Sequence, residues 1–464
     1  MDVSPRRQCN RCGHRISYSY NRKCGYGMPR LVNRAGKSDL PIRGSSSAKL
    51  LAMMPAFAIF YILLILPFFP DDGKGRIENI LFWPILAALV LALVFQNRAQ
   101  IDPRFFRSVP ITSLIAYLVF AAASVTWAYS PDYAFTRVVV QVLALIVVVA
   151  PYALRARGKG AIPGVYYCYV LAMVVSAVFV LTIPPSPIGH PGYFTHKQEL
   201  GLLAAIGIIL SSYQILQRGW SRIIAFFTIV LGFWLVFESV SKSALAFAII
   251  ALVAAWLILM VCKLTRLTPA FIVAAIVVVS LFVANPIERL GYRMYGDATL
   301  TGRTGIWGFI EYQISHRPWF GWGFKSYYFV PNSPQEQAPG YIKEMPSSHS
   351  GYMELKLETG RFGYWIFLVF IYSSLHLIER VRRVDPVRAW FYLSVQLFAV
   401  LSNLLDSSWL TLTHFWLLYV IVTAETIRFS LLSAERAPAS VGAVRPVRVG
   451  QGGRLPRLAS GAPQ

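Results

Sequence analysis

The sequence predicts an all-α integral membrane protein with about 12 transmembrane helices and one large loop on the outer side of the membrane. Two observations predict this fold class. Hydrophobic residues make up 56% of the 464 residues and charged residues only 14%, so the apolar surface exceeds what one soluble core could bury. The apolar residues also form continuous runs rather than alternating ones, and only a helix satisfies its own backbone in lipid.

Apolar windows of roughly 17 to 25 residues, the length of a helix that crosses a bilayer, position the helices in order. The predicted spans are residues 50–70, 78–95, 109–127, 134–154, 162–184, 198–216, 221–238, 242–262, 267–285, 359–379, 387–405 and 410–430. The chain then divides into a basic cytoplasmic tail (1–49), helices 1 to 9 (50–285), the large outer loop (286–358), helices 10 to 12 (359–430) and a disordered cytoplasmic tail (431–464).

Lysine and arginine predict the orientation, because short cytoplasmic loops carry the positive excess. Alternate loops hold Arg98, Arg104 and Arg107; Arg155, Arg157 and Lys159; Arg218 and Arg222; Lys263 and Arg266; and Arg380, Arg382, Arg383 and Arg388. The loops between them hold few cations, so both termini are predicted inside and the large loop outside. The formal charge of +23 is thus a topology signal, and nucleic acid is not expected as a partner.

Cysteines give no strong metal or redox signal. Three of the five precede the first span, and the pair Cys9 and Cys12 has only His14 and Cys24 nearby. A zinc ribbon needs a second paired knuckle, so a basic disordered tail or a mis-chosen start is the alternative interpretation. The sequence predicts no cofactor and no metal site.

Polar residues at membrane depth are functional candidates, and two groups lie at the outer ends of predicted helices. His196 and Lys197 open the sixth span together with an amide and a carboxylate. Lys242 lies in a very short turn among serines, which favours a polar pocket. Snorkelling of the lysine to the interface is the alternative.

The large loop carries two further motifs. The first predicts a helix from about Thr301, with Arg303 near its start and Ile306, Trp307, Ile310 and Ile314 as an apolar stripe. Proline forbids continuation after Arg317. In the second, Ser347 or Ser348 is predicted to cap a helix with His349 in its first turn.

His349 is the predicted general base. The positive end of a helix lowers the pKa of a histidine, which then stays neutral and can accept a proton. Glu354 and Glu358, one helical turn apart, are rivals that could share or replace this role. Several cations with one histidine suit an anionic phosphate substrate that is handled without a metal.

At these residues the sequence resembles the O-antigen ligase/Wzy polymerase superfamily, and within it the exopolysaccharide-production (ExoQ-like) branch. The resemblance covers roughly residues 50–430 and rests on His196-Lys197-Gln198 with Gly201, the Ser-x-Ser-Lys242-Ser turn, Gly302-Arg303-Thr304 to Trp307, the string from Arg317 to Gly323, and His349 with Gly360 and Gly363. Ligases generally have arginine at position 242 and asparagine at position 198, and these departures favour a polymerase.

The resemblance implies a metal-independent, inverting glycosyl transfer on the periplasmic side of a bacterial inner membrane. The donor would be a glycan on undecaprenyl diphosphate, the acceptor a second glycan, and the product an exopolysaccharide. By carry-over, Arg303 and Lys242 would hold the diphosphate and His349 would be the base. His196, Lys197 and Arg317 are further candidates for substrate binding, and Glu354 for catalysis.

Two alternative functions stay open at this point, and so does one partner. A ligase of the same fold would transfer finished glycan to the lipid A core or another acceptor. A transporter or flippase is a different class, but it should show internal repeats and paired mid-bilayer charges, whereas here only Arg137 with Gln141 lies deep in a span. A chain-length co-polymerase could also regulate the protein as a partner, besides the lipid bilayer itself.

Overall fold

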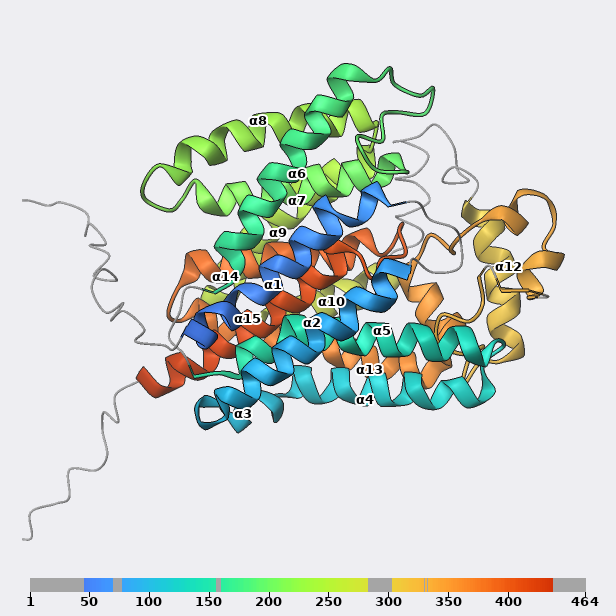
Figure 1. The fold of residues 1–464 in the computed structure, drawn as a ribbon, viewed down its shortest axis with the longest axis horizontal. Coiled ribbons are helices and arrows are strands. Elements are labelled where there is room, and N and C mark those ends of the chain that lie inside the picture. The colour runs from blue at the N-terminus through green and yellow to red at the C-terminus, as the bar shows by residue number, and fades with distance from the viewer. Residues whose placement is uncertain are drawn as a thin grey trace, which may run out of the picture. The chain divides into compact units, whose positions relative to one another are not determined.

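The computed structural model describes residues 46–69, 77–155, 160–282, 303–328, 330–331 and 333–436, and these form helices without a β-strand. Residues 1–45 and 437–464 of the predicted tails, with Cys9, Cys12 and Cys24, lie outside the described residues, as do residues 283–302. The α-helices are α1 (Ser46–Leu64), α2 (Ile77–Gln96), α3 (Pro103–Phe106), α4 (Val109–Ala123), α5 (Pro131–Val149), α6 (Ile162–Thr182), α7 (Lys197–Gln214), α8 (Ser221–Ser239), α9 (Lys242–Thr265), α10 (Pro269–Phe282), α12 (Arg303–His316), α13 (Gly351–Arg382), α14 (Pro386–Ser402) and α15 (His414–Arg436) (Figure 1).

Every predicted span coincides with one of these helices. In the described part of the chain, eight helices are long and apolar enough to cross a membrane: α1, α4, α5, α6, α8, α9, α13 and α15, some together with an adjoining 3₁₀ turn. Helices α2 and α10 contribute shorter apolar stretches, Leu81–Gln96 and Pro269–Val279. The protein is an all-α membrane protein, and the number of 12 spans stays a prediction.

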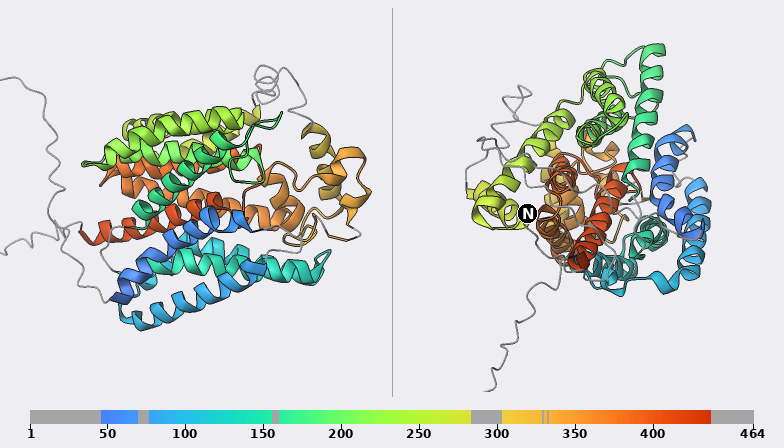
Figure 2. Two further views of the ribbon diagram at one scale, coloured as in Figure 1. Left: turned by 45° about the horizontal axis from the view of Figure 1, so that its top comes forward. Right: turned by 90° about the vertical axis from the view of Figure 1, so that its left-hand side faces the viewer.

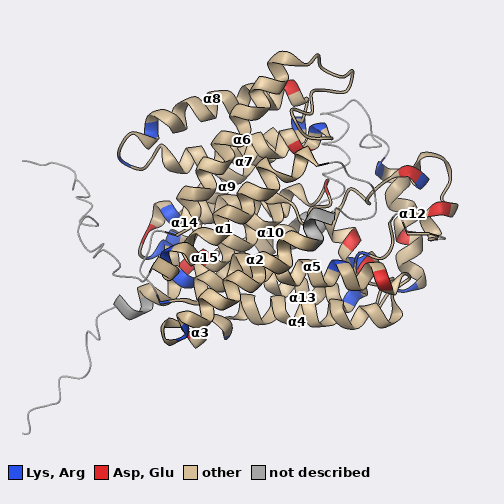
Figure 3. Ribbon diagram, viewed as in Figure 1, with Lys and Arg blue, Asp and Glu red and all other residues tan. Residues whose placement is uncertain are grey.

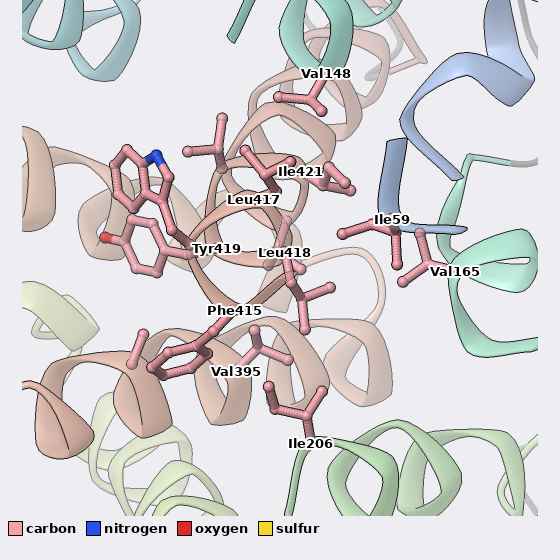
Figure 4. Packing of buried hydrophobic residues seen from close by; sticks show 14 of the residues in the cluster. Ile59, Val148, Val165, Ile206, Val395, Phe415, Leu417, Leu418, Tyr419 and Ile421 are labelled. Atoms are coloured by element: carbon pink, nitrogen blue, oxygen red, sulfur yellow. The ribbon is translucent and has the colours of Figure 1, made fainter. Parts of the chain in front are cut away.

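Helix α15 occupies the centre of the bundle, and 78% of its apolar window is buried within the protein. Figure 4 shows Leu417, Leu418 and Ile421 of α15 among side chains of other helices, including Ile59 and Val165. Helices that face lipid instead leave large apolar side chains exposed, as α8 does with Phe226 and Phe227. The buried core and the apolar outside together are what a lipid-embedded bundle requires.

Charged side chains gather towards the two ends of the bundle, and the helices between them are almost free of charge (Figure 3). One end carries the loops predicted to be rich in arginine, and we call it the arginine-rich end. There the backbone of Asp102 donates to Ala153 at 2.8 Å, which joins two of these loops. The opposite end carries α12 and is called the α12 end; Figure 2 shows both ends in further views. The separation of the two kinds of loop agrees with the alternation in the sequence.

Helix α13 is kinked at Gly360, whose backbone has φ +63° and ψ −164°. A segment that we call the strap, residues 318–323, supplies hydrogen bonds at this break. Trp322 donates to the carbonyl of Leu357 at 2.8 Å, and Arg361 donates to the carbonyl of Pro318 at 2.9 Å. The strap thus satisfies backbone groups that the kink leaves without helical partners.

The α12 end has a small hydrophobic core of its own. Ile306 and Ile310 of α12 are buried with Tyr327, Ile342 and Leu357, so the predicted apolar stripe faces protein. Helix α12 ends at His316, two residues before Pro318, as predicted. One boundary differs, because α13 begins at Gly351 and its first turns belong to the segment predicted as loop. The predicted start of the tenth span at residue 359 marks the kink instead.

Candidate functional site

His349 lies in a short loop immediately before α13. The helix begins at Gly351 with Ser350 at the N-cap, so the prediction that His349 lies in the first helical turn is wrong. The reason is that the Gly351 N–H donates to the carbonyls of Asn403 and Asp406, at 2.9 and 2.8 Å, where the neighbouring loop approaches. His349 takes a left-handed conformation, with φ +52°, which is uncommon for a residue with a side chain.

The imidazole of His349 is half-buried, and its Nδ1 has no hydrogen-bond partner among the described residues. Burial lowers the pKa of His349 below its usual value, and the charges of Arg303 and His196 lower it further. The charge of Asp406 acts in the opposite direction. The predicted lowering of the pKa is confirmed, although burial and Arg303 cause it rather than a helix end. A neutral imidazole at pH 7 can accept a proton.

We call His349 and the three residues whose charges shift its pKa the His349 cluster: His349, Arg303, His196 and Asp406. Arg303 is the first residue of α12 and is half-buried. His196 is the N-cap of α7, where its Nδ1 accepts from the Gln198 N–H at 3.4 Å. The cluster combines side chains from two helix starts and two loops that are far apart in the sequence.

Asp406 was missed by the sequence analysis, which used its loop only as a stretch without positive charge. It lies in the loop between α14 and α15, and its carboxylate accepts from Ser408 Oγ at 2.7 Å. A single acidic residue in a short loop on the predicted outer side was the available signal. Nothing local in the sequence indicates its proximity to His349.

The other three predicted binding residues lie outside the His349 cluster. Lys197 Nζ donates to the carbonyl of Ile188 at 2.6 Å. Arg317 donates to the carbonyl of Trp127 at 3.2 Å and stacks over the ring of Trp322 at 4.4 Å, so it fixes the strap. Lys242 is the exposed first residue of α9, and roles for these three residues in substrate binding stay predictions.

The serines beside Lys242 take part in hydrogen bonds within the turn. Ser239 Oγ donates to the carbonyl of Val236 at 2.9 Å, and the Ser241 N–H donates to Ser239 Oγ at 3.3 Å. The side chain of Ser241 packs so closely on Gly201 of α7 that a Cβ at Gly201 would overlap it. Gly201 and the Ser-x-Ser sequence therefore explain how α7 approaches the turn.

Glu354 belongs to a second group, which we call the Lys325 cluster: the half-buried Arg137 and Lys325 and the buried Glu354 and Glu358. Lys325 Nζ lies 3.4 Å from Glu354 Oε2 and 3.3 Å from Glu358 Oε1. Burial lowers the pKa of Lys325, but the two carboxylates outweigh it and raise the pKa above its usual value. Arg137 of α5 donates to the backbone carbonyl of Lys325. The sequence analysis missed Lys325, since a lone lysine in a loop has no local signature.

No group of three or more histidine, cysteine or acidic residues in the described ranges could hold a metal ion. The two described cysteines, Cys168 and Cys262, are both free and lie in α6 and α9.

Comparison with known proteins gives one family. Residues 227–368 match the family model described as O-antigen ligase, and this segment contains Lys242, Arg303, His349 and Glu354. No curated protein matches the chain. Members of such a family act on lipid-linked glycans as polymerases or ligases, in agreement with the bundle of apolar helices. Residues 227–368 of the chain are thus similar to the O-antigen ligase family.

Proposed function

We propose that the protein is a polymerase that joins oligosaccharide repeats carried on undecaprenyl diphosphate into an exopolysaccharide. The observation that carries the proposal is the half-buried histidine at the α12 end of a membrane bundle, whose pKa is lowered by burial and by the charge of Arg303. In this position the polyprenyl chain of a substrate can stay in lipid while its sugars stay in water. We place this end on the periplasmic side of the inner membrane, because the opposite end holds the arginine-rich loops.

The proposed reaction is a single displacement. His349 takes the proton from an acceptor hydroxyl, whose oxygen then forms a bond to the anomeric carbon of the donor sugar. The bond from that carbon to the diphosphate oxygen breaks, and undecaprenyl diphosphate leaves with the electron pair. One displacement inverts the anomeric configuration.

The described cations fit the leaving group. A guanidinium can make two parallel hydrogen bonds to phosphate oxygens, so Arg303 stabilises the charge that grows on the diphosphate. A diphosphate leaves readily without a general acid, unlike the leaving group of a glycosidase. Because side-chain cations take the role of a counter-ion, the reaction should proceed unchanged in EDTA.

A ligase is the second candidate, because the matching family model is described as O-antigen ligase. The two differ only in the acceptor, which is a second lipid-linked repeat for the polymerase and the lipid A core for the ligase. Purified full-length protein should be given lipid-linked repeats alone, and then repeats with lipid A core. Long lipid-linked chains from repeats alone support the polymerase. Transfer that occurs only with the core would replace it by the ligase.

A further inference from the structure

We propose that Glu354 is a positioning residue that holds the His349 loop in its reactive conformation, and that Lys325 in turn fixes the carboxylate of Glu354. This inference rests on the proposed role of His349 as the base. It assigns to Glu354 a role other than the proton acceptor that the sequence analysis considered.

Glu354 reaches the loop directly. Its Oε1 accepts from the backbone N–H of Ser348 at 3.1 Å, and Ser348 immediately precedes His349. Its Oε2 accepts from Lys325 Nζ at 3.4 Å. The side chain is only 5% exposed. Both oxygens are thus used inside the protein, which leaves the carboxylate poorly placed to receive a proton from a bound sugar.

The loop needs such support because its conformation is strained. A non-glycine residue with φ +52° persists only where its surroundings determine the backbone. Ser348 is fixed at both of its backbone groups, since its carbonyl accepts from the indole N–H of Trp307 at 3.0 Å. Trp307 lies on α12, the helix that begins with Arg303. The peptide groups before His349 therefore join the helix that carries the phosphate-binding arginine to the helix that carries Glu354.

Lys325 makes the arrangement electrostatically possible. Two buried carboxylates one helical turn apart repel each other unless a cation lies between them, and Lys325 occupies that position. Lys325 is itself held, because Arg137 donates to its carbonyl. The Lys325 cluster therefore connects α5 and α13 to the backbone next to the proposed base.

The experiment compares full-length variants expressed in a strain that lacks the chromosomal gene. Polymer length and lipid-linked single repeats are measured per amount of protein in the membrane. The variants are Glu354→Gln, Glu354→Ala, Lys325→Met, the double variant Lys325→Met with Glu354→Gln, and His349→Ala as reference. Glu358→Gln is the matched control, because it removes the same charge beside Lys325 without touching the loop. Thermal unfolding in detergent identifies variants that fold poorly.

Glutamine keeps an oxygen that can accept from Ser348 but has no basicity, so Glu354→Gln should lose less than about tenfold in polymer formation. Glu354→Ala should lose about 10²-fold, because the loop and His349 are then misplaced. Glu358→Gln should lose less than Glu354→Ala. Lys325→Met leaves two carboxylates without a cation, and adding Glu354→Gln should restore both protein amount and polymer.

The outcomes separate the two proposals. Wild-type polymer from His349→Ala overturns the proposed function, whatever the glutamate variants do. If His349→Ala is inactive and Glu354→Gln is equally inactive at normal abundance, Glu354 is required as a charged group and the positioning role is wrong. Equal activity of Glu354→Ala and wild type would overturn it as well. Recovery in the double variant supports it, since a proton acceptor could not be replaced there by glutamine.

Discussion

The His349 cluster and the Lys325 cluster lie at the same end of the bundle, and both combine cations with carboxylates. In the Lys325 cluster the lysine is paired with both carboxylates at 3.3 to 3.4 Å, and the two carboxylates are buried. In the His349 cluster the imidazole is half-buried and its Nδ1 lacks a partner in the part of the chain that the structure describes. We call the Lys325 cluster closed, because its charged side chains pair with one another, and the His349 cluster, whose imidazole is half-buried, open. A closed set of charges fixes the backbone, whereas an open set is the better candidate for contact with a substrate.

Replacing His349 is the most direct test of whether the open cluster contains the reactive residue. His349→Ala should reduce polymer formation by about 10²- to 10⁴-fold, because the acceptor hydroxyl keeps its proton. The protein should still insert into the membrane and bind undecaprenyl diphosphate. Lipid-linked single repeats should accumulate and can be measured by mass spectrometry. Normal polymer at normal protein abundance would show that the open cluster is not the reactive one.

Arg303 should give the next largest effect. Arg303→Ala should reduce the rate by about 10²- to 10³-fold, as for other groups that stabilise charge in a transition state. Arg303→Lys should recover little, because lysine keeps the charge but cannot make two parallel bonds to a phosphate. The rate of polymer formation and the binding of undecaprenyl diphosphate are measured on the purified variants. Full binding by Arg303→Lys would show that charge alone suffices.

Gly360, where α13 contacts the strap, offers a substitution that should change stability without replacing a side chain of either cluster. Gly360 has φ +63°, and a Cβ there would overlap the carbonyl of Trp319, so Gly360→Ala should destabilise the protein by more than about 1 to 3 kcal/mol. Gly308→Ala in α12 is the comparison, because Gly308 does not have a positive φ and a Cβ there would meet nothing within 4 Å. Thermal unfolding in detergent should fall further for Gly360→Ala. An equal fall in both would remove the kink as its cause.

The helices could be predicted from the sequence because length and hydropathy are local properties, and proline limits α12 by a local rule. Contacts between charged side chains could not be predicted, because they depend on how distant segments pack. Lys325 reaches the two glutamates because the strap runs along the kink of α13, and the kink itself is hidden within a continuous helix of 32 residues. The charge of Asp406 acts on His349 only because the α14–α15 loop folds against the start of α13. His349 and Arg303 could be proposed from the sequence because they lie in recognisable motifs.

Lys242 represents a third situation for a cation. It is exposed at the start of α9, and no described residue pairs with its side chain as a buried partner. Lys242→Ala should reduce activity by about tenfold, less than Arg303→Ala, because water screens an exposed charge. Lys242→Arg should retain activity, since it restores the residue that the wider family has at this position. Polymer formation at low and high salt is the measurement. A wild-type rate for Lys242→Ala at both salt concentrations would assign the lysine to snorkelling.

The pH dependence should show the smallest effect, and it tests whether Asp406 belongs to the open cluster. A base must be neutral to act, so activity should fall as the pH drops through the pKa of His349, which burial and nearby positive charges lower. Arg303 and His196 lower that pKa and Asp406 raises it, because a nearby anion stabilises the imidazolium. Asp406→Asn should therefore move the acidic limb of the activity profile to lower pH, while Glu358→Gln, which changes a charge of the closed cluster, should leave it in place. A shift in the opposite direction would mean that Asp406 influences the reaction through a group other than His349.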